Sequence, residues 1–228
     1  MEPTRSAHVA PAAQAVPSMP PPPGGAWAWL ERPLHAAFIQ LNRLLMIPLH
    51  RAGLAAWIAT PVGGYMLLLR VRGRQSGIVR EIPLSYLVAE GSVWVLAGFG
   101  PRTQWYRNLL VHPEVEVRLP GRSFRAAAAE ETDPAVRARI MPALARAAGL
   151  PGLMIGVNPW SAGDRAILQA LDWVPLVGLD PAQGPVAAGS DDPGGRAWLW
   201  RQGLVVALVA LKAWGVRWTL RRLRRVGR

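Results

Sequence analysis

Five strand-like segments separated by short turns occupy the middle of this 228-residue chain and constrain its fold most strongly. Glycine-containing turns follow three of these segments, which predicts antiparallel hairpins. Strand and helix do not alternate regularly, so a doubly wound parallel sheet is excluded. The expected strands are 65–71, 78–88, 93–97, 115–119 and 123–129, and the turns are 73–77, 90–91 and 120–121.

Helical patterns flank these strands and complete an α+β chain. An apolar repeat predicts a helix from Trp27 that Pro48 should end or kink. Ser161, with Asp164 three residues later, resembles a capping box that would open another helix. The strands and helices together favour an antiparallel barrel or sandwich that carries helices. The further expected helices are 54–58, 105–111, 133–149 and 161–171, and a last strand is expected at 173–179.

Composition divides the chain into five regions. Prolines and glycines without apolar periodicity predict a disordered tail at the N-terminus, and no apolar run there suits a signal peptide. A glycine, proline and aspartate segment late in the chain reads as a linker. The expected regions are a tail at 1–25, N-terminal helices at 26–62, the barrel domain at 63–181, a linker at 182–195 and a C-terminal helix at 196–228.

The C-terminal helix carries most of the excess positive charge. The chain has 26 Lys and Arg against 14 Asp and Glu, and residues 190–228 hold nine of the cations with only two aspartates. A charge inside a bilayer costs about 2.5 to 3.5 kcal/mol, so we expect a helix that lies on an anionic membrane surface. Packing on the domain or on a second subunit is the alternative, and nucleic-acid binding is disfavoured. The flanking tryptophans are Trp198, Trp200, Trp214 and Trp218.

Several familiar chemistries are excluded. The chain has no cysteine, which removes disulfides, thiolate metal sites and cysteine nucleophiles. Its four histidines are far apart and lack a second ligand at helical spacing, so no metal site is expected. No nucleophile elbow, P-loop or dinucleotide fingerprint is present. We therefore assign no catalytic side chain.

The turn at 73–77 is the strongest candidate for binding an anion. It contains two glycines, backbone N–H groups and the hydroxyl of Ser76. Arg72 and Arg74 lie in or beside it, and Arg80 follows on the next expected strand. Such a turn can hold a phosphate, although a basic glycine turn is also common as a solvated hairpin tip.

Three ordered motifs carry a resemblance to a known family. They read LRVRGRQSGIVREIPL at 69–84, VWVLAGFG at 93–100 and WYRNLLVHPEVEV at 105–117. Together they resemble the deazaflavin-dependent nitroreductases and the F420H2-dependent quinone reductases, over about 65–181. The resemblance implies a split β-barrel of the flavin-reductase type and coenzyme F420 as cofactor, with FMN as the alternative.

The resemblance also implies where the cofactor lies. Residues of the turn would meet its phosphate, residues after the third strand would follow the deazaflavin ring, and the Trp-Tyr-x-Asn motif would close that side. Asn108 and backbone N–H groups near Gly98 would contact the ring carbonyls. The implied cofactor-binding residues are Arg74, Gln75, Ser76, Arg80, Pro83, Ala97, Gly98, Phe99, Trp105 and Asn108.

Two departures from the family bear on function. Many members carry lysine at the position of Gln75, and the stretch 148–165 has no tyrosine of the kind found in the reductases of nitroaromatic prodrugs. We expect hydride transfer from reduced F420 to a quinone, nitro or enone acceptor, in a cytoplasmic protein at the inner face of the membrane. A non-catalytic protein that binds F420 or FMN, or a membrane-surface protein of the same fold, is the alternative. The sequence does not fix an oligomeric state.

Overall fold

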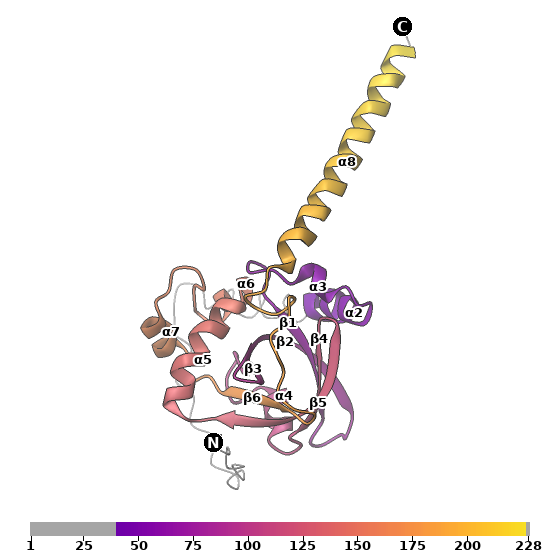
Figure 1. The fold of residues 1–228 in the computed structure, drawn as a ribbon. Helices are drawn as coiled ribbons and strands as arrows, with labels where there is room; N and C mark the ends of the chain where they lie inside the picture. The colour runs from indigo at the N-terminus through magenta and orange to yellow at the C-terminus, as the bar shows by residue number, and fades with distance from the viewer. Residues whose placement is uncertain (1–39, 227–228) are drawn as a thin grey trace.

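The computed structural model describes residues 40–226, and a closed antiparallel barrel of six strands forms its centre (Figure 1). Around the barrel the strands follow the order β1-β2-β3-β6-β5-β4, and β4 pairs with β1 to close it. The predicted α+β fold built on an antiparallel barrel is confirmed. The strands are β1 (Met66–Arg72), β2 (Val79–Ala89), β3 (Ser92–Leu96), β4 (Glu114–Leu119), β5 (Arg122–Glu131) and β6 (Leu176–Pro181).

Helices surround the barrel and connect its strands. The expected tail at 1–25 and the beginning of the expected N-terminal helices lie outside the described residues. The helical elements are η1 (Asn42–Met46), α2 (Ile47–Arg51), α3 (Ala55–Ile58), α4 (Gln104–Leu109), α5 (Pro134–Ala147), α6 (Leu150–Met154), α7 (Asp164–Ala170) and α8 (Ala197–Val226).

Alternation of apolar and charged residues decides which face of each strand enters the core. In β4 the buried Val115, Val117 and Leu119 alternate with charged side chains that face outward. The inward side chains of the barrel form one apolar cluster, which includes Leu67, Leu69 and Tyr86. A second cluster lies between the outer face of β3 and the helices α5 and α7.

The order of strands along the chain explains why the sequence reveals the hairpins so clearly. β1 and β2 pair from Met66↔Ser85 to Arg72↔Val79, and the turn at 73–77 joins them. β4 and β5 pair from Glu114↔Ala127 to Leu119↔Arg122. Each pair is local in sequence, so its turn residues and apolar alternation fix its register.

Helix α5 begins as the sequence predicts. The side chain of Asp133 accepts a hydrogen bond of 2.8 Å from the backbone N–H of Ala135, and Pro134 occupies the first turn. The helix continues through the buried Pro142 as one element to Ala147. Its buried face packs against Trp94 and Ile167 in the second apolar cluster.

Two expected boundaries are wrong, and the effect of Pro48 differs in part. Pro48 does not end its helix; the π-helical η1 lies directly before α2 and places Pro48 in the first turn of α2. Ser161 does not cap α7: Gly163 is the N-cap, without a side-chain bond, and Asp164 pairs with Arg146 at 2.5 Å. The last strand begins at Leu176, three residues later than expected.

The segment expected as a linker, 182–195, lies against the barrel. Asp192 is 2% exposed, accepts hydrogen bonds from Gly189 N and the Arg122 guanidinium, and accepts another of 3.2 Å from the Tyr86 hydroxyl. Burial raises the pKa of Tyr86, and Asp192 adds to that shift, so the hydroxyl stays protonated and donates. We call this segment the strap.

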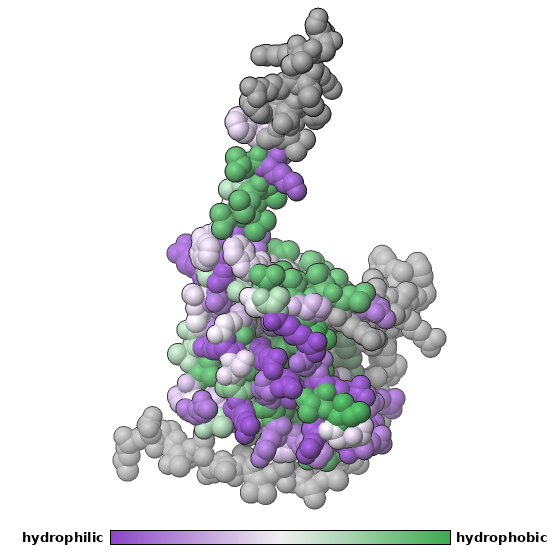
Figure 2. All heavy atoms as spheres, turned by 90° about the vertical axis from the view of Figure 1, so that its right-hand side faces the viewer, coloured by the Kyte–Doolittle hydropathy of each residue, from purple (hydrophilic) through white to green (hydrophobic). Residues whose placement is uncertain are grey.

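Helix α8 leaves the barrel as a projecting rod whose root is fixed to α3 (Figure 1). Arg201 Nη1 donates to Ala56 O at 3.0 Å, and Gln202 Nε2 donates to Trp57 O at 2.9 Å. Arg201 also pairs with Asp191 of the strap. Figure 2 shows hydrophobic residues along the described part of the rod. Among the described residues no helix has the length and hydropathy needed to cross a bilayer.

Acid should weaken the docking of α2 through His50. Burial lowers the pKa of His50, and its Nε2 is buried with no hydrogen-bond partner among residues 40–226. Below pH 6.5, the ordinary value, the unfolded chain then binds more protons than the folded protein. The free energy of unfolding should therefore have its full value above pH 6.5 and decrease as the pH drops below it.

Urea unfolding between about pH 5 and about pH 7.5 measures this effect. We expect His50→Gln to show a smaller loss of stability across the range than wild type, because glutamine does not titrate. Equal losses in the two proteins would contradict a role for His50.

Candidate cofactor-binding site

A tight turn between β1 and β2 forms the first part of the site. Gly73 N donates to Ile78 O at 2.9 Å, and Gly77 N donates to Gly73 O at 2.8 Å. Gly77 has a φ of 66°, a conformation that glycine adopts without strain. A Cβ at Gly73 would lie 2.7 Å from Ser76 Oγ, so the hydroxyl occupies the space that the glycine leaves.

Helix α4 holds this turn in place. The Asn108 Oδ1 atom accepts hydrogen bonds from Arg74 N at 3.2 Å and from Arg74 Nη1 at 2.9 Å. The same Nη1 donates to Gln104 Oε1 at 3.0 Å. Two residues that the motifs predict, 34 positions apart, are therefore in direct contact. The Arg74 guanidinium is oriented by neutral partners and keeps its full charge for a ligand.

The arginines in and beside the turn differ in their partners from the other outward arginines of β1 and β4, which form ion pairs. Within residues 40–226, no carboxylate pairs with Arg72, Arg74 or Arg80. Gln75 and Ser76 are exposed beside them. The turn therefore offers cationic and neutral donors to an anion without first breaking an ion pair. This donor set fits a phosphorylated cofactor.

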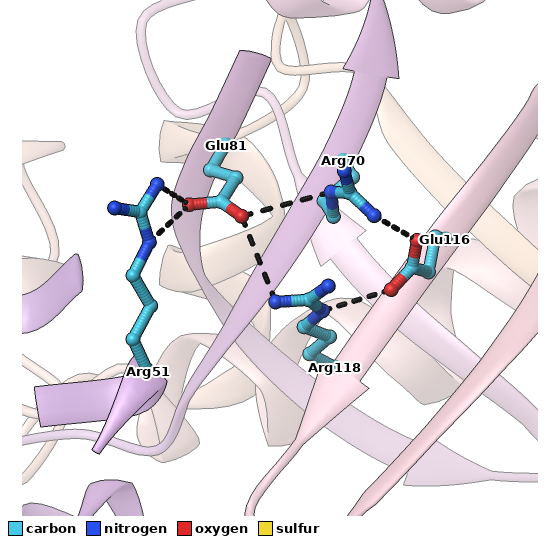
Figure 3. Close-up of polar contacts among 5 residues, drawn as sticks. All are labelled: Arg51, Arg70, Glu81, Glu116 and Arg118. Carbon is cyan, nitrogen blue, oxygen red and sulfur yellow. Dashed lines mark hydrogen bonds and ion pairs between the residues drawn. The ribbon is translucent and has the colours of Figure 1, made fainter. Parts of the chain in front are cut away.

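The other outward arginines of β1 and β4 form an ion-pair network instead (Figure 3). Glu81 of β2 accepts from Arg51 of α2 at 2.6 Å and lies 3.6 Å from both Arg70 and Arg118. Glu116 of β4 pairs with Arg70 and accepts from Arg118 at 2.8 Å. The bonds from these arginines, Arg118 first, lower the pKa of Glu116. The network attaches α2 to the barrel.

The segment after β3 forms a second part of the site. Ala97 is buried, and its N–H donates to Pro175 O at 3.0 Å. A Cβ at Gly98 would lie 2.7 Å from Ile155 Cγ2, so Gly98 permits the connection after α6 to lie close against this segment. Phe99 is partly exposed at 39%. Thr103 Oγ1 then donates to Gly100 O at 2.6 Å, where the chain turns into α4.

Trp105 lies in the apolar core. It is 7% exposed, and its ring makes an edge contact with Tyr106 at 6.3 Å between centroids. The Tyr106 hydroxyl donates to Glu130 at 2.6 Å. These contacts fix α4 on the barrel, so Trp105 supports the position of Asn108 through the helix.

The structure brings the predicted residues to two neighbouring places on the barrel. The turn joins Arg74 to Asn108 through α4, and α4 is also the element that follows the segment with Ala97, Gly98 and Phe99. Arg80 lies beside the turn, opposite Val71. Pro83 is half-buried further along β2, opposite Leu68.

Sequence reasoning missed two residues of the site. Gln104 contacts Arg74, and its position four residues before Asn108 on a helix places both on the same face. Ile155 contacts Gly98 across more than fifty residues, and no local pattern predicts that contact.

Comparison with family models gives one similarity for part of this chain. The structure is an α+β barrel with a cationic turn between β1 and β2. Residues 53–149 match the family model of F420H(2)-dependent quinone reductase. Over this stretch, which is less than half of the chain, the sequence is similar to that family.

Several solved structures are distantly similar to the chain. No curated protein sequence matches the chain. A conserved hypothetical protein from Mycobacterium tuberculosis is 16% identical, with a TM-score of 0.40 over 57% of this chain and 79% of its own. The heme storage protein HutZ from Vibrio cholerae is 18% identical, with a TM-score of 0.39 over 54% and 85%. An F420-H2 dependent reductase (FDR-A) is 18% identical, with a TM-score of 0.35 over 50% and 93%.

Proposed function

We propose that this protein reduces a small organic acceptor with a hydride from reduced coenzyme F420, near a membrane surface. The acceptor is a quinone, or a nitro or enone compound. The observation that carries the proposal is the family match, because its range includes the cationic turn, the segment after β3 and Asn108. The expectation that the protein is an F420-dependent oxidoreductase agrees with the family.

Each part of the site has a separate task. Arg74, Gln75 and Ser76 bind the phosphate, and Arg72 and Arg80 strengthen the positive field around it. The Asn108 side chain holds Arg74 in the binding position. The cost of ordering this arginine is therefore met before the ligand arrives.

The residues after β3 orient the ring. Ala97, Gly98 and Phe99 line its side of the site, and backbone N–H groups near Gly98 bind its carbonyls. Reduced F420 supplies a hydride which, with one proton, converts a quinone into a hydroquinone. The side chains around Gly98 and Ile155 are mainly apolar, so they exclude water and orient an acceptor without acting as acid or base.

Anaerobic turnover with a water-soluble quinone analogue tests the proposal. We expect oxidation of reduced F420 in proportion to enzyme, with no comparable rate from reduced FMN. Nitro and enone compounds, assayed in parallel, decide the acceptor class. Tight F420 binding without turnover of any acceptor would establish the non-catalytic alternative, and a preference for FMN would overturn the cofactor assignment.

Gln75→Lys should tighten F420 binding, because it adds a cation to a turn that binds phosphate. The side chain is exposed, so we expect the Kd to fall by only about two- to fivefold. High salt should remove this difference. Fluorescence titration at two salt concentrations measures it. Gln169→Lys, on the exposed side of α7, is the matched control and should change nothing. An equal gain in both variants would attribute the effect to net charge alone.

A further inference from the structure

Helix α8 is an apolar rod whose described middle part is exposed. Leu204, Val206, Leu208, Val209 and Leu211 are all exposed, between 42% and 66%. At 3.6 residues per turn these positions span about 220° of the helix circumference, and Ala207 and Ala210 occupy the remaining sector. Such a surface is unfavourable in water and marks a contact with an apolar partner.

A second group of exposed apolar residues lies at the root of this rod. We call Leu54, Val62, Leu150 and Leu153 the apolar plate, and they are between 44% and 58% exposed. These residues come from three segments of the chain that are connected to one another. Leu54 is the N-cap of α3, Val62 follows α3, and Leu150 N donates to Val62 O at 2.8 Å.

The plate and the rod belong to one rigid piece of the molecule. α3 carries Leu54 and also binds the root of α8 through Ala56 O and Trp57 O. The rings of Trp57 and Trp200 make an edge contact at 6.0 Å between centroids. Figure 1 shows α3 and α6 both at the root of α8, and Figure 2 shows hydrophobic residues over this end of the domain. One partner can therefore contact both surfaces.

The charge pattern identifies the chemistry of that partner. Between residues 203 and 214 the only charged residue is Lys212, and residues 215–228 carry no acidic residue. That last stretch contains Arg217, Arg221, Arg222, Arg224, Arg225 and Arg228. Apolar residues followed by a cluster of arginines suit an anionic lipid surface. A second copy alongside in parallel would instead bring two arginine clusters together.

We propose that the barrel domain itself contacts the membrane: the apolar plate and α8 dock together on an anionic lipid surface. This inference rests on the proposed function, in which the reaction takes place near a membrane. The plate lies beside the acceptor side of the site, since Leu153 is two residues from Ile155, which contacts Gly98. A lipid-soluble acceptor then reaches the site from the bilayer.

Sedimentation of the full-length protein with vesicles tests the plate separately from α8. The vesicles are phosphatidylcholine alone, or phosphatidylcholine with phosphatidylglycerol. We expect wild type to bind the anionic vesicles preferentially. Leu54→Ser with Val62→Ser should weaken partitioning about tenfold although α8 is intact.

The matched control replaces two exposed apolar residues between α4 and β4. Leu110→Ser with Val111→Ser should change partitioning by no more than about twofold. Thermal unfolding verifies that both double variants are folded. Binding of the plate variant equal to wild type would overturn the inference, as would equal binding to neutral vesicles. Lipid-free dimers that the plate substitutions dissociate would also overturn it.

Turnover with the water-soluble quinone separates this inference from the proposed function. The plate variant should retain wild-type turnover in solution and lose rate only with a long-chain quinone in vesicles. If no variant turns over any acceptor while the plate variant still loses vesicle binding, the proposed function fails and the membrane contact is supported.

Discussion

An Arg74→Ala variant is expected to bind coenzyme F420 about 10- to 100-fold more weakly than wild type. The substitution removes a guanidinium that α4 orients through Asn108 and Gln104, and no carboxylate among the described residues neutralises it. A hydrogen bond to a charged group contributes about 1.5 to 3 kcal/mol, which gives this range of Kd. Equilibrium fluorescence titration with F420 measures the change, with FMN titrated in parallel.

Two further variants separate a local contact from a general loss of charge. Arg139→Ala removes the same charge from α5, where Arg139 pairs with Glu90 at 3.0 Å, and it should leave the Kd unchanged. Asn108→Ala keeps Arg74 but removes its main acceptor, so we expect an intermediate loss. Equal weakening by the arginine variants would show that the turn is not the phosphate site.

Asp192→Ala is expected to lower the free energy of unfolding by about 3 to 5 kcal/mol, because it leaves a partly buried arginine without its partner. Asp192 is buried and accepts hydrogen bonds from Arg122, Gly189 and Tyr86. Without the carboxylate, the strap also loses its attachment to the barrel. Urea unfolding followed by tryptophan fluorescence and by circular dichroism measures the loss.

Tyr86→Phe provides the comparison for this effect. It removes one donor to Asp192 and keeps the ion pair, so the expected loss is about 1 kcal/mol. A loss below about 1 kcal/mol for Asp192→Ala would show that the strap contributes little to stability. A loss in the strap alone, with the barrel transition unchanged, would have the same meaning.

The sequence predicts the local parts of this fold well. The hairpin of β1 and β2 follows from two glycines between apolar runs, and the start of α5 follows from Asp133 before Pro134. Each depends on residues that are neighbours in sequence. The sequence also predicts that Arg74 and Asn108 belong to one site, because both residues lie in the ordered motifs.

The long-range parts could not be predicted in the same way. Barrel closure pairs β1 with β4 and β3 with β6, and no turn sets those registers. The Arg51, Glu81 and Arg118 network joins a helix to two strands, although charge alternation in β4 hinted at its outward face. The strap resembles a linker in composition, and its contacts with the barrel, which include the buried Asp192, distinguish it from one.

The position of the strap between barrel and rod has a consequence for synthesis. Translation runs from the N-terminus, so β6 leaves the ribosome before α8 and every strand of the barrel can pair before the apolar helix emerges. Adjacent aspartates then act in turn: Asp192 secures the strap to the barrel, and Asp191 receives Arg201 at the root of α8. The nascent chain can thus pair every barrel strand before it exposes the apolar residues of α8.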